Sequence, residues 1–199
     1  TVMFDFEDGA QGWEIATDWP QVTGVEAADG ALVVSGAWTG DGWNEGGALV
    51  QNEEGFDLSE YSLLTVDVCA PEGAVEFFAQ IFMKSGEEWV WANTPGGAPV
   101  AGECTVYEAV LADMGDMTDV KLIGVKVGTS ATAFEGAFTV DNVTLTKLGE
   151  AVEEVEAEPV GPMVEKSMLV HSFSDDVSGW VMADYWAAGT GLEAVDGAL

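Results

Sequence analysis

The chain has 199 residues, and its 36 acidic residues against five lysines and no arginine give a formal net charge of −31. Contact with nucleic-acid phosphates or anionic lipid headgroups needs clustered basic side chains, so we expect neither partner. No apolar run reaches the roughly 20 residues of a membrane-spanning helix, so no membrane insertion is expected. A lone histidine, His171, argues against a His-based catalytic triad and against zinc sites of the Cys/His type.

Short runs of alternating apolar and polar residues, separated by turn signals such as Asp29-Gly30 and Pro95-Gly96-Gly97, predict strands along the first three quarters of the chain. The clearest runs are residues 2–6, 31–35, 48–52, 63–69, 75–83, 88–93, 105–111, 122–127 and 138–145. No segment has the pattern of an amphipathic helix. So many short strands in about 150 residues predict an all-β domain, a β-sandwich or jelly roll, over residues 1–148.

Residues 149–167 interrupt this pattern with glutamates among alanine, valine and proline, which predicts an extended acidic linker, with a helical spacer as the lesser alternative. The start of the chain then returns at an offset of 167, from Phe6/Phe173 to Leu32/Leu199, with 14 of 27 aligned residues identical. Residues 168–199 are therefore expected to be the N-terminal part of a second, truncated copy of the same module. We expect a fragment of a longer protein, or self-association of the partial repeat with another chain.

Six tryptophans lie in the first module. Trp13, which follows a glycine beside the first strand and recurs as Trp180, is expected in the core. Trp38 and Trp43 lie in a glycine-rich segment, Ala37–Asn44, that we expect to be a loop between two strands. Aromatic side chains in such a loop are poorly placed for a core and well placed to contact a ligand.

Strand alternation gives a second group of candidates. In the hairpin 77–93 we expect Ala79, Ile81, Val90 and Ala92 to face the interior, which leaves Gln80, Lys84, Trp89 and Trp91 on the outer face. Residues 122–127 add Lys126 to that face. Aromatic patches bordered by polar groups usually bind something, although packing of Trp89 and Trp91 under a loop is the alternative.

Sugar recognition suits these residue types. A pyranose ring has an apolar face on which an indole can stack, and hydroxyls that amides, ammonium groups and carboxylates can hydrogen-bond. Carboxylates on the first and last strands and in a turn also suggest a Ca²⁺ site, because Ca²⁺ takes six to eight oxygen ligands. The candidate ligands are Asp5, Glu7, Asp29 and Asp141, with exposed acids as the alternative. Cys69 and Cys104 form either a disulfide or two free thiols.

The opening Phe4-Asp5-Phe6-Glu7-Asp8-Gly9 and the ending Phe138-Thr139-Val140-Asp141-Asn142-Val143 resemble those of jelly-roll carbohydrate-binding modules. Residues 1–148 most resemble family 27, whose members bind β-mannans beside mannanase catalytic domains. The resemblance implies that Trp19, Trp43 and Trp89 stack on consecutive mannose units and that a structural Ca²⁺ lies near Asp5 and Asp141. Trp91, Gln80 and the lack of arginine depart from the family pattern.

These observations predict a non-catalytic module that binds a soluble β-mannan, such as glucomannan or galactomannan, on a secreted or surface-attached bacterial protein. Trp19, Trp43 and Trp89 would stack on the sugar, and Gln80, Lys84, Trp91, Lys126 and Trp38 would add contacts. The alternative is a structural or adhesive β-sandwich repeat of a cell-surface fibre, assembled by strand complementation. A jelly-roll glycosidase is a third class, which predicts release of reducing sugar from mannan, and we expect none.

Overall fold

Two antiparallel sheets account for the strand pattern. The computed structural model describes residues 1–147 and 149, so the acidic linker beyond Gly149, the partial repeat with Trp186, and any self-association through that repeat lie outside the described residues. The elements are β1 (Val2–Phe4), β2 (Trp13–Ile15), β3 (Val22–Ala28), β4 (Ala31–Thr39), β5 (Asn44–Phe56), β6 (Tyr61–Cys69), β7 (Phe77–Ser85), β8 (Val90–Asn93), β9 (Cys104–Val110), the 3₁₀ helix η1 (Leu111–Asp113), β10 (Val120–Thr129) and β11 (Ala133–Lys147).

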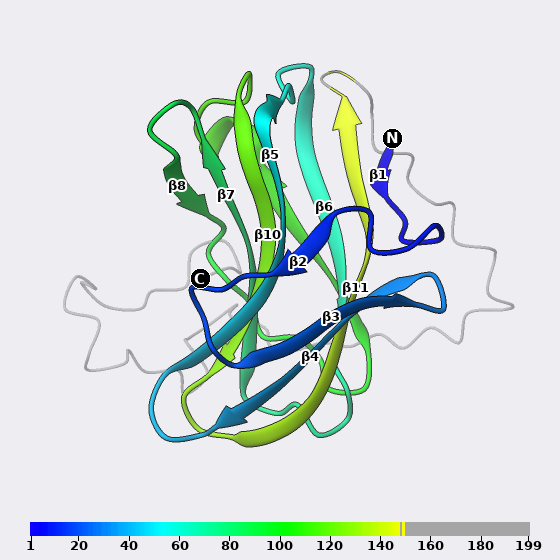
Figure 1. Cartoon of the computed structure of the whole chain (residues 1–199), viewed down its shortest axis with the longest axis vertical. Helices are drawn as coiled ribbons and strands as arrows, with labels where there is room; N and C mark the ends of the chain where they lie inside the picture. The colour runs from blue at the N-terminus through cyan, green and yellow to red at the C-terminus, as the bar shows by residue number, and fades with distance from the viewer. Residues whose placement is uncertain (148, 150–199) are drawn as a thin grey trace, which may run out of the picture. The chain divides into compact units, whose positions relative to one another are not determined.

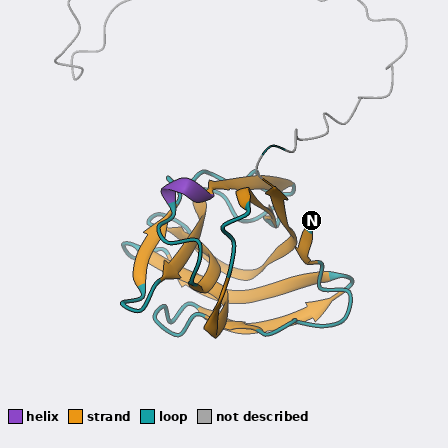
Figure 2. Cartoon of the chain, turned by 90° about the horizontal axis from the view of Figure 1, so that it is seen from above, coloured by secondary structure: helices purple, strands orange, loops and turns teal. Residues whose placement is uncertain are grey.

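The first sheet has the order β3-β4-β11-β6-β9, and β1 also pairs with β11 (Figure 1). The second sheet has the order β2-β5-β10-β7-β8, and every strand pairing in both sheets is antiparallel. Seen from above, the strands lie on opposite sides of the interior, with η1 at the rim (Figure 2). The predicted all-β sandwich of the jelly-roll class is confirmed, and its first and last strands, β1 and β11, pair with each other.

The core lies between the sheets because alternate residues of each strand point inward. On β7, Ala79 and Ile81 are fully buried, as predicted, and on β10 Ile123, Val125 and Val127 are at most 3% exposed. The prediction was wrong for Val90, which is 58% exposed at the start of the edge strand β8.

Trp38 is part of this core, so its expected place in a ligand-contacting loop is wrong. β4 continues to Thr39, and its even-numbered residues from Leu32 to Trp38 are buried. The Trp38 side chain is 2% exposed and packs edge-on against Phe77 and Phe138, at centroid distances of 5.4 and 5.6 Å. Gly36 makes room for the indole, because a Cβ there would lie 2.6 Å from its Cη2 atom. A buried indole cannot stack on a ligand.

The short strand β2 and the strand β3 were not predicted. β3 lies at a sheet edge and carries Gly24 and two alanines, so its alternation of apolar and polar residues is weak. Conversely, β1 ends at Phe4, before the predicted end at Phe6, whose φ of 55° departs from the strand conformation.

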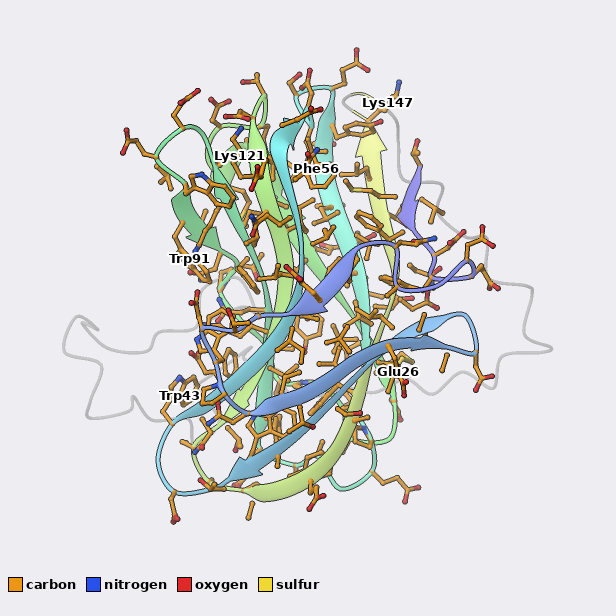
Figure 3. All side chains as sticks on the ribbon, viewed as in Figure 1. Glu26, Trp43, Phe56, Trp91, Lys121 and Lys147 are labelled. Atoms are coloured by element: carbon orange, nitrogen blue, oxygen red, sulfur yellow. A yellow bond between two sulfur atoms is a disulfide. The ribbon has the colours of Figure 1, made fainter. Side chains whose placement is uncertain are left out.

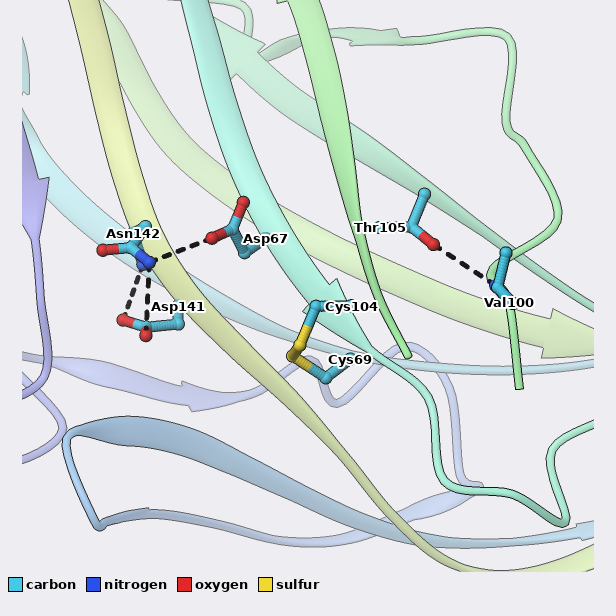
Figure 4. Close-up of a disulfide and its surroundings, with 7 residues drawn as sticks. All are labelled: Asp67, Cys69, Val100, Cys104, Thr105, Asp141 and Asn142. Carbon is cyan, nitrogen blue, oxygen red and sulfur yellow. Dashed lines mark hydrogen bonds between the residues drawn. A yellow bond between two sulfur atoms is a disulfide. The ribbon is translucent and has the colours of Figure 1, made fainter. Parts of the chain in front are cut away.

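Cys69 and Cys104 form a disulfide, which decides between the two alternatives left open by the sequence (Figure 4). They are register partners on β6 and β9, so the bond ties the edge strand of the first sheet to its neighbour. The helix found within the described residues, η1, spans three residues and is far too short to cross a bilayer.

Candidate functional site

A glycine-lined stripe of β10 forms the floor of an aromatic surface on the second sheet. Gly124, Lys126 and Gly128 alternate with the inward-facing valines, so all three face outward. Any Cβ at Gly124 would collide with the ring of Phe82, and one at Gly128 would collide with the ring of Phe78. Both phenylalanines come from β7, the neighbouring strand, and their rings lie across the positions that the two glycines leave empty.

A tryptophan stacks on each of these phenylalanines. Trp91 lies 4.8 Å from Phe82 with the planes 13° apart, and Trp43 lies 4.8 Å from Phe78 with the planes 23° apart. Trp19 stands edge-on against both rings of the first pair. The exposed fractions are 62% for Trp43 and 38% for Trp91. We call these five residues the aromatic face.

Lys126 lies between the two stacked pairs. Its Nζ atom is 5.1 Å from the ring centroid of Trp19 and 5.8 Å from those of Trp91 and Phe78. The same atom makes a 2.8 Å ion pair with Oε1 of Glu45 on β5. The ammonium group is therefore held by a carboxylate and by cation–π attraction to rings of both pairs.

Hydrogen bonds orient the exposed indole of Trp91. Its Nε1–H donates to Oδ1 of Asn93 at 2.7 Å, and the Asn93 amide in turn donates to the carbonyl of Thr94 at 2.9 Å. Because this hydrogen bond holds the indole N–H, the Trp91 side chain has few accessible rotamers. It therefore presents the apolar face of its ring in a fixed orientation. Figure 3 shows Trp91 and Trp43 on the same side of the molecule.

The loop that carries Trp43 is held by the buried Asn44. The Asn44 amide donates to the carbonyl of Gly42 at 2.8 Å, and its Oδ1 accepts from Gln21 at 3.2 Å and from Thr39 at 3.1 Å. Asn44 is 6% exposed, so these bonds satisfy a polar group inside the fold. The exposed tryptophan is therefore carried by a braced loop.

The other predicted site residues have different surroundings. Trp89 lies in the turn before β8 with a φ of 52°, and it makes none of the ring–ring contacts found among residues 1–147. Gln80 faces outward as expected, but it is 8% exposed and donates to the carbonyl of Thr94. Lys84 lies over Trp91 at 5.9 Å from its centroid. The structure thus joins Trp19, Trp43, Trp91, Lys84 and Lys126, and leaves Trp89 apart.

The four predicted calcium ligands do not assemble into one site. Oδ1 of Asp5 accepts from the Gln11 side chain at 2.8 Å, and this bond chiefly lowers the pKa of Asp5. The Glu7 carboxylate lies against Gly30, beside Asp29. Asp141 instead faces Asp67 across the β6–β11 pair (Figure 4).

Asn142 lies between those two aspartates and donates to Asp67 at 2.9 Å and to Asp141 at 3.4 Å. Within the described part of the chain, no group of three or more acidic, cysteine or histidine side chains is placed to hold a metal. These residues do not form a calcium site by themselves, and calcium binding stays a prediction.

Sequence reasoning did not assign Phe78, Phe82 and Glu45 to the site. The signal for the two phenylalanines was strand alternation, because Phe78 and Phe82 alternate with the inward-facing Ala79 and Ile81. No comparable signal marked Glu45, because it is one of 36 acidic residues and its role depends on the register between β5 and β10.

The aromatic face presents two exposed indoles, and the Lys126–Glu45 ion pair lies between its two stacked pairs of rings. Indoles favour flat, apolar surfaces, whereas the ion pair offers both a hydrogen-bond donor and an acceptor. No acid–base or nucleophilic machinery is apparent among the residues that form it. The arrangement is thus suited to holding an extended ligand that has apolar faces and hydroxylated edges.

Comparison with known proteins yields one family model, described as a mannanase, galactose-binding domain-like, which matches residues 4–142. Among solved structures, a family 27 module of Caldicellulosiruptor saccharolyticus in complex with mannohexaose aligns with a TM-score of 0.57 and 17% identity, over 72% of this chain and 94% of the module. A module specific for non-crystalline cellulose, of family 28, aligns with a TM-score of 0.54 and 20% identity, over 72% and 92%.

A third structure comes from work on promiscuous specificity among β-sandwich carbohydrate-binding modules. It aligns with a TM-score of 0.59 and 19% identity over 74% of this chain, which spans 62% of that protein's length. At such identities these likenesses establish the fold alone. No curated protein sequence matches the chain.

Proposed function

This chain belongs to the family of mannanase galactose-binding-like domains, and we propose that it binds a soluble β-mannan without catalysing its cleavage. The sugar chain would lie along the aromatic face, with pyranose rings stacked on Trp43 and Trp91. Trp19 would border the ligand beside Trp91. The family resemblance implied that Trp89 stacks on the ligand; in this proposal Trp91 has that role instead.

The observation that carries the proposal is the pair of exposed indoles, Trp43 and Trp91. Each stacks on a phenylalanine of β7 that lies over a glycine of β10. Rigid, pre-oriented aromatic surfaces lose little conformational entropy when a ligand stacks on them. Each stacked tryptophan would contribute about 1–2 kcal/mol, by analogy with aromatic contacts in proteins. One module would therefore bind with weak to moderate affinity.

The choice of mannan over other β-glycans rests on the family and on the family 27 neighbour that was solved with mannohexaose. The neighbour of family 28, which is specific for non-crystalline cellulose, has the same fold. Another structure with this fold, a family 11 module, was solved with a β-1,3-1,4-mixed-linked tetrasaccharide. Cellulose and mixed-linkage glucan are therefore the proper competitors in a binding test.

We also propose that the protein works outside the cell, where it would direct an attached activity to polysaccharide. The disulfide between Cys69 and Cys104 supports this placement, because disulfides persist in oxidising compartments.

Affinity electrophoresis in gels containing glucomannan, galactomannan, mixed-linkage glucan or hydroxyethylcellulose tests the proposal. We expect the wild-type chain to be retarded most by the two mannans, and the double variant Trp43→Ala/Trp91→Ala to migrate as it does without polysaccharide. Release of reducing sugar from mannan would contradict the non-catalytic assignment. Equal retardation of wild type and double variant would remove the aromatic face from the site.

A further inference from the structure

From the proposed function we infer one further role: the Lys126–Glu45 ion pair is a polar clamp that reads neighbouring hydroxyls of the sugar unit lying between the two stacked tryptophans. This assigns a specificity-determining role to Glu45. The pair would contribute only to ligands long enough to reach both indoles.

The position of the pair comes from the strand register. Gly124 and Gly128 are four residues apart on β10, so the two phenylalanines above them are separated by about 13 Å along the strand. Lys126 lies midway between these glycines, with its ammonium group within 6 Å of rings from both stacked pairs. A ligand that engages both indoles must therefore pass over it.

The chemistry of the pair matches two adjacent hydroxyl groups. The ammonium group of Lys126 is a donor only, whereas the Glu45 carboxylate is an acceptor only, and they lie 2.8 Å apart. A vicinal diol can accept from the first and donate to the second. Both side chains are mostly covered, with relative exposures of 12% and 16%, so the pair is held in place before the ligand arrives.

A purely structural role for the pair is the competing explanation, and β10 itself provides the control. Lys121, on the same strand, makes a 2.7 Å ion pair with Asp119, with relative exposures of 13% and 25%. The cation–π contacts with rings of the face are made by Lys84 and Lys126, whereas Lys121 makes none of them. Figure 3 places Lys121 near one end of β10, away from Trp43.

The test titrates the full chain with β-1,4-linked manno-oligosaccharides from mannobiose to mannohexaose by calorimetry. We expect Lys126→Met and Glu45→Gln each to weaken mannohexaose binding about tenfold, as for the loss of a hydrogen bond to a charged group. The loss of affinity should become smaller as the oligosaccharide becomes shorter. It should nearly vanish for the shortest oligomer that the wild-type chain binds. Lys121→Met and Asp119→Asn should bind every oligomer as wild type does.

Wild-type affinity of both clamp variants for mannohexaose would overturn the inference. An equal loss at every length would also overturn it, because the pair would then only support the rings. If the wild-type chain binds cello-oligosaccharides instead of manno-oligosaccharides, the proposal that the ligand is mannan is wrong. The role of the pair is then tested by the same comparison of ligand lengths with cello-oligosaccharides. If it binds neither series, both proposals fall together.

Discussion

The indole of Trp91 lies on the ring of Phe82, which itself lies over Gly124, so the exposed surface at this point is the top of a three-layer stack. The ring centroids are 4.8 Å apart and the planes are 13° from parallel. Each layer fixes the height of the one above it. Recognition at the surface therefore depends on residues that a ligand never touches.

Trp91→Ala should weaken mannan binding about 5- to 30-fold, which corresponds to the loss of about 1–2 kcal/mol of stacking. Trp89→Ala is the matched control, because Trp89 lies two residues away and outside the aromatic face. Calorimetry with mannohexaose measures both. The reverse pattern, in which only the Trp89 variant loses affinity, would restore the assignment that the family resemblance implied.

Gly124→Ala should lower both stability and affinity, because the new methyl group would meet the Phe82 ring and the carbonyl of Ala48. We expect the free energy of unfolding to fall by about 1–3 kcal/mol, as in other overpacked sites. Gly24→Ala, on the edge strand β3, is the control, because its Cβ would meet only Ser35 at an ordinary 3.9 Å. Urea unfolding and mannohexaose titration of both variants make the comparison, and equal stability of the two would contradict the stacked floor.

Replacing both cysteines by alanine should destabilise the domain and leave sugar binding unchanged. The bond closes a loop with a sequence separation of 35, for which chain entropy gives about 3–4 kcal/mol of stabilisation. β6 and β9 belong to the first sheet, whereas the aromatic face lies on the second. Thermal unfolding measures the loss of stability, and mannohexaose titration below the unfolding transition measures sugar binding. A loss of affinity in the folded double variant would contradict the prediction that sugar binding is unchanged.

Tyr107 should make the domain sensitive to strong alkali. Its hydroxyl donates to the carbonyl of Gly97 at 3.0 Å, and burial raises its pKa from 10.0 to about 12. Between these values the folded chain keeps a proton that the unfolded chain has lost, so stability is intact below pH 10 and falls as the pH rises towards 12. The loss amounts to about 2–3 kcal/mol.

Tyr107→Phe removes this titration, so its stability should decline less steeply over the same pH interval. Urea midpoints at several pH values from 9 to 12 give the two slopes. Identical slopes for wild type and variant would show that the alkaline loss comes from other groups.

The fold class was predictable from sequence because alternation within strands records which face is buried. The same periodicity placed Lys126 outward and Ile81 inward, and it also marks Trp38 as inward once β4 is extended by four residues. That error arose because glycine-rich sequence was read as loop. Gly36 instead accommodates the indole of a neighbouring buried residue.

The candidate site was predictable only in part. Alternation assigned both Trp89 and Trp91 to the outer face, but the left-handed conformation of Trp89 breaks the alternation one residue before β8 begins. The place of Glu45 depends on which residues face each other across β5 and β10, which no local pattern specifies. Such long-range register becomes visible only in three dimensions.

The bare backbone at Gly124 and Gly128 restricts how this domain can diverge. Any substituent there would lift a ring, so new ligand preferences cannot readily arise from the floor itself. Variation is instead expected in the segments that bear Trp19, Trp43 and Trp91. Their lengths and sequences can change while the glycines of β10 and the rings over them stay the same. Related domains with different sugar preferences should accordingly differ most in these three segments and least in the paired glycines beneath them.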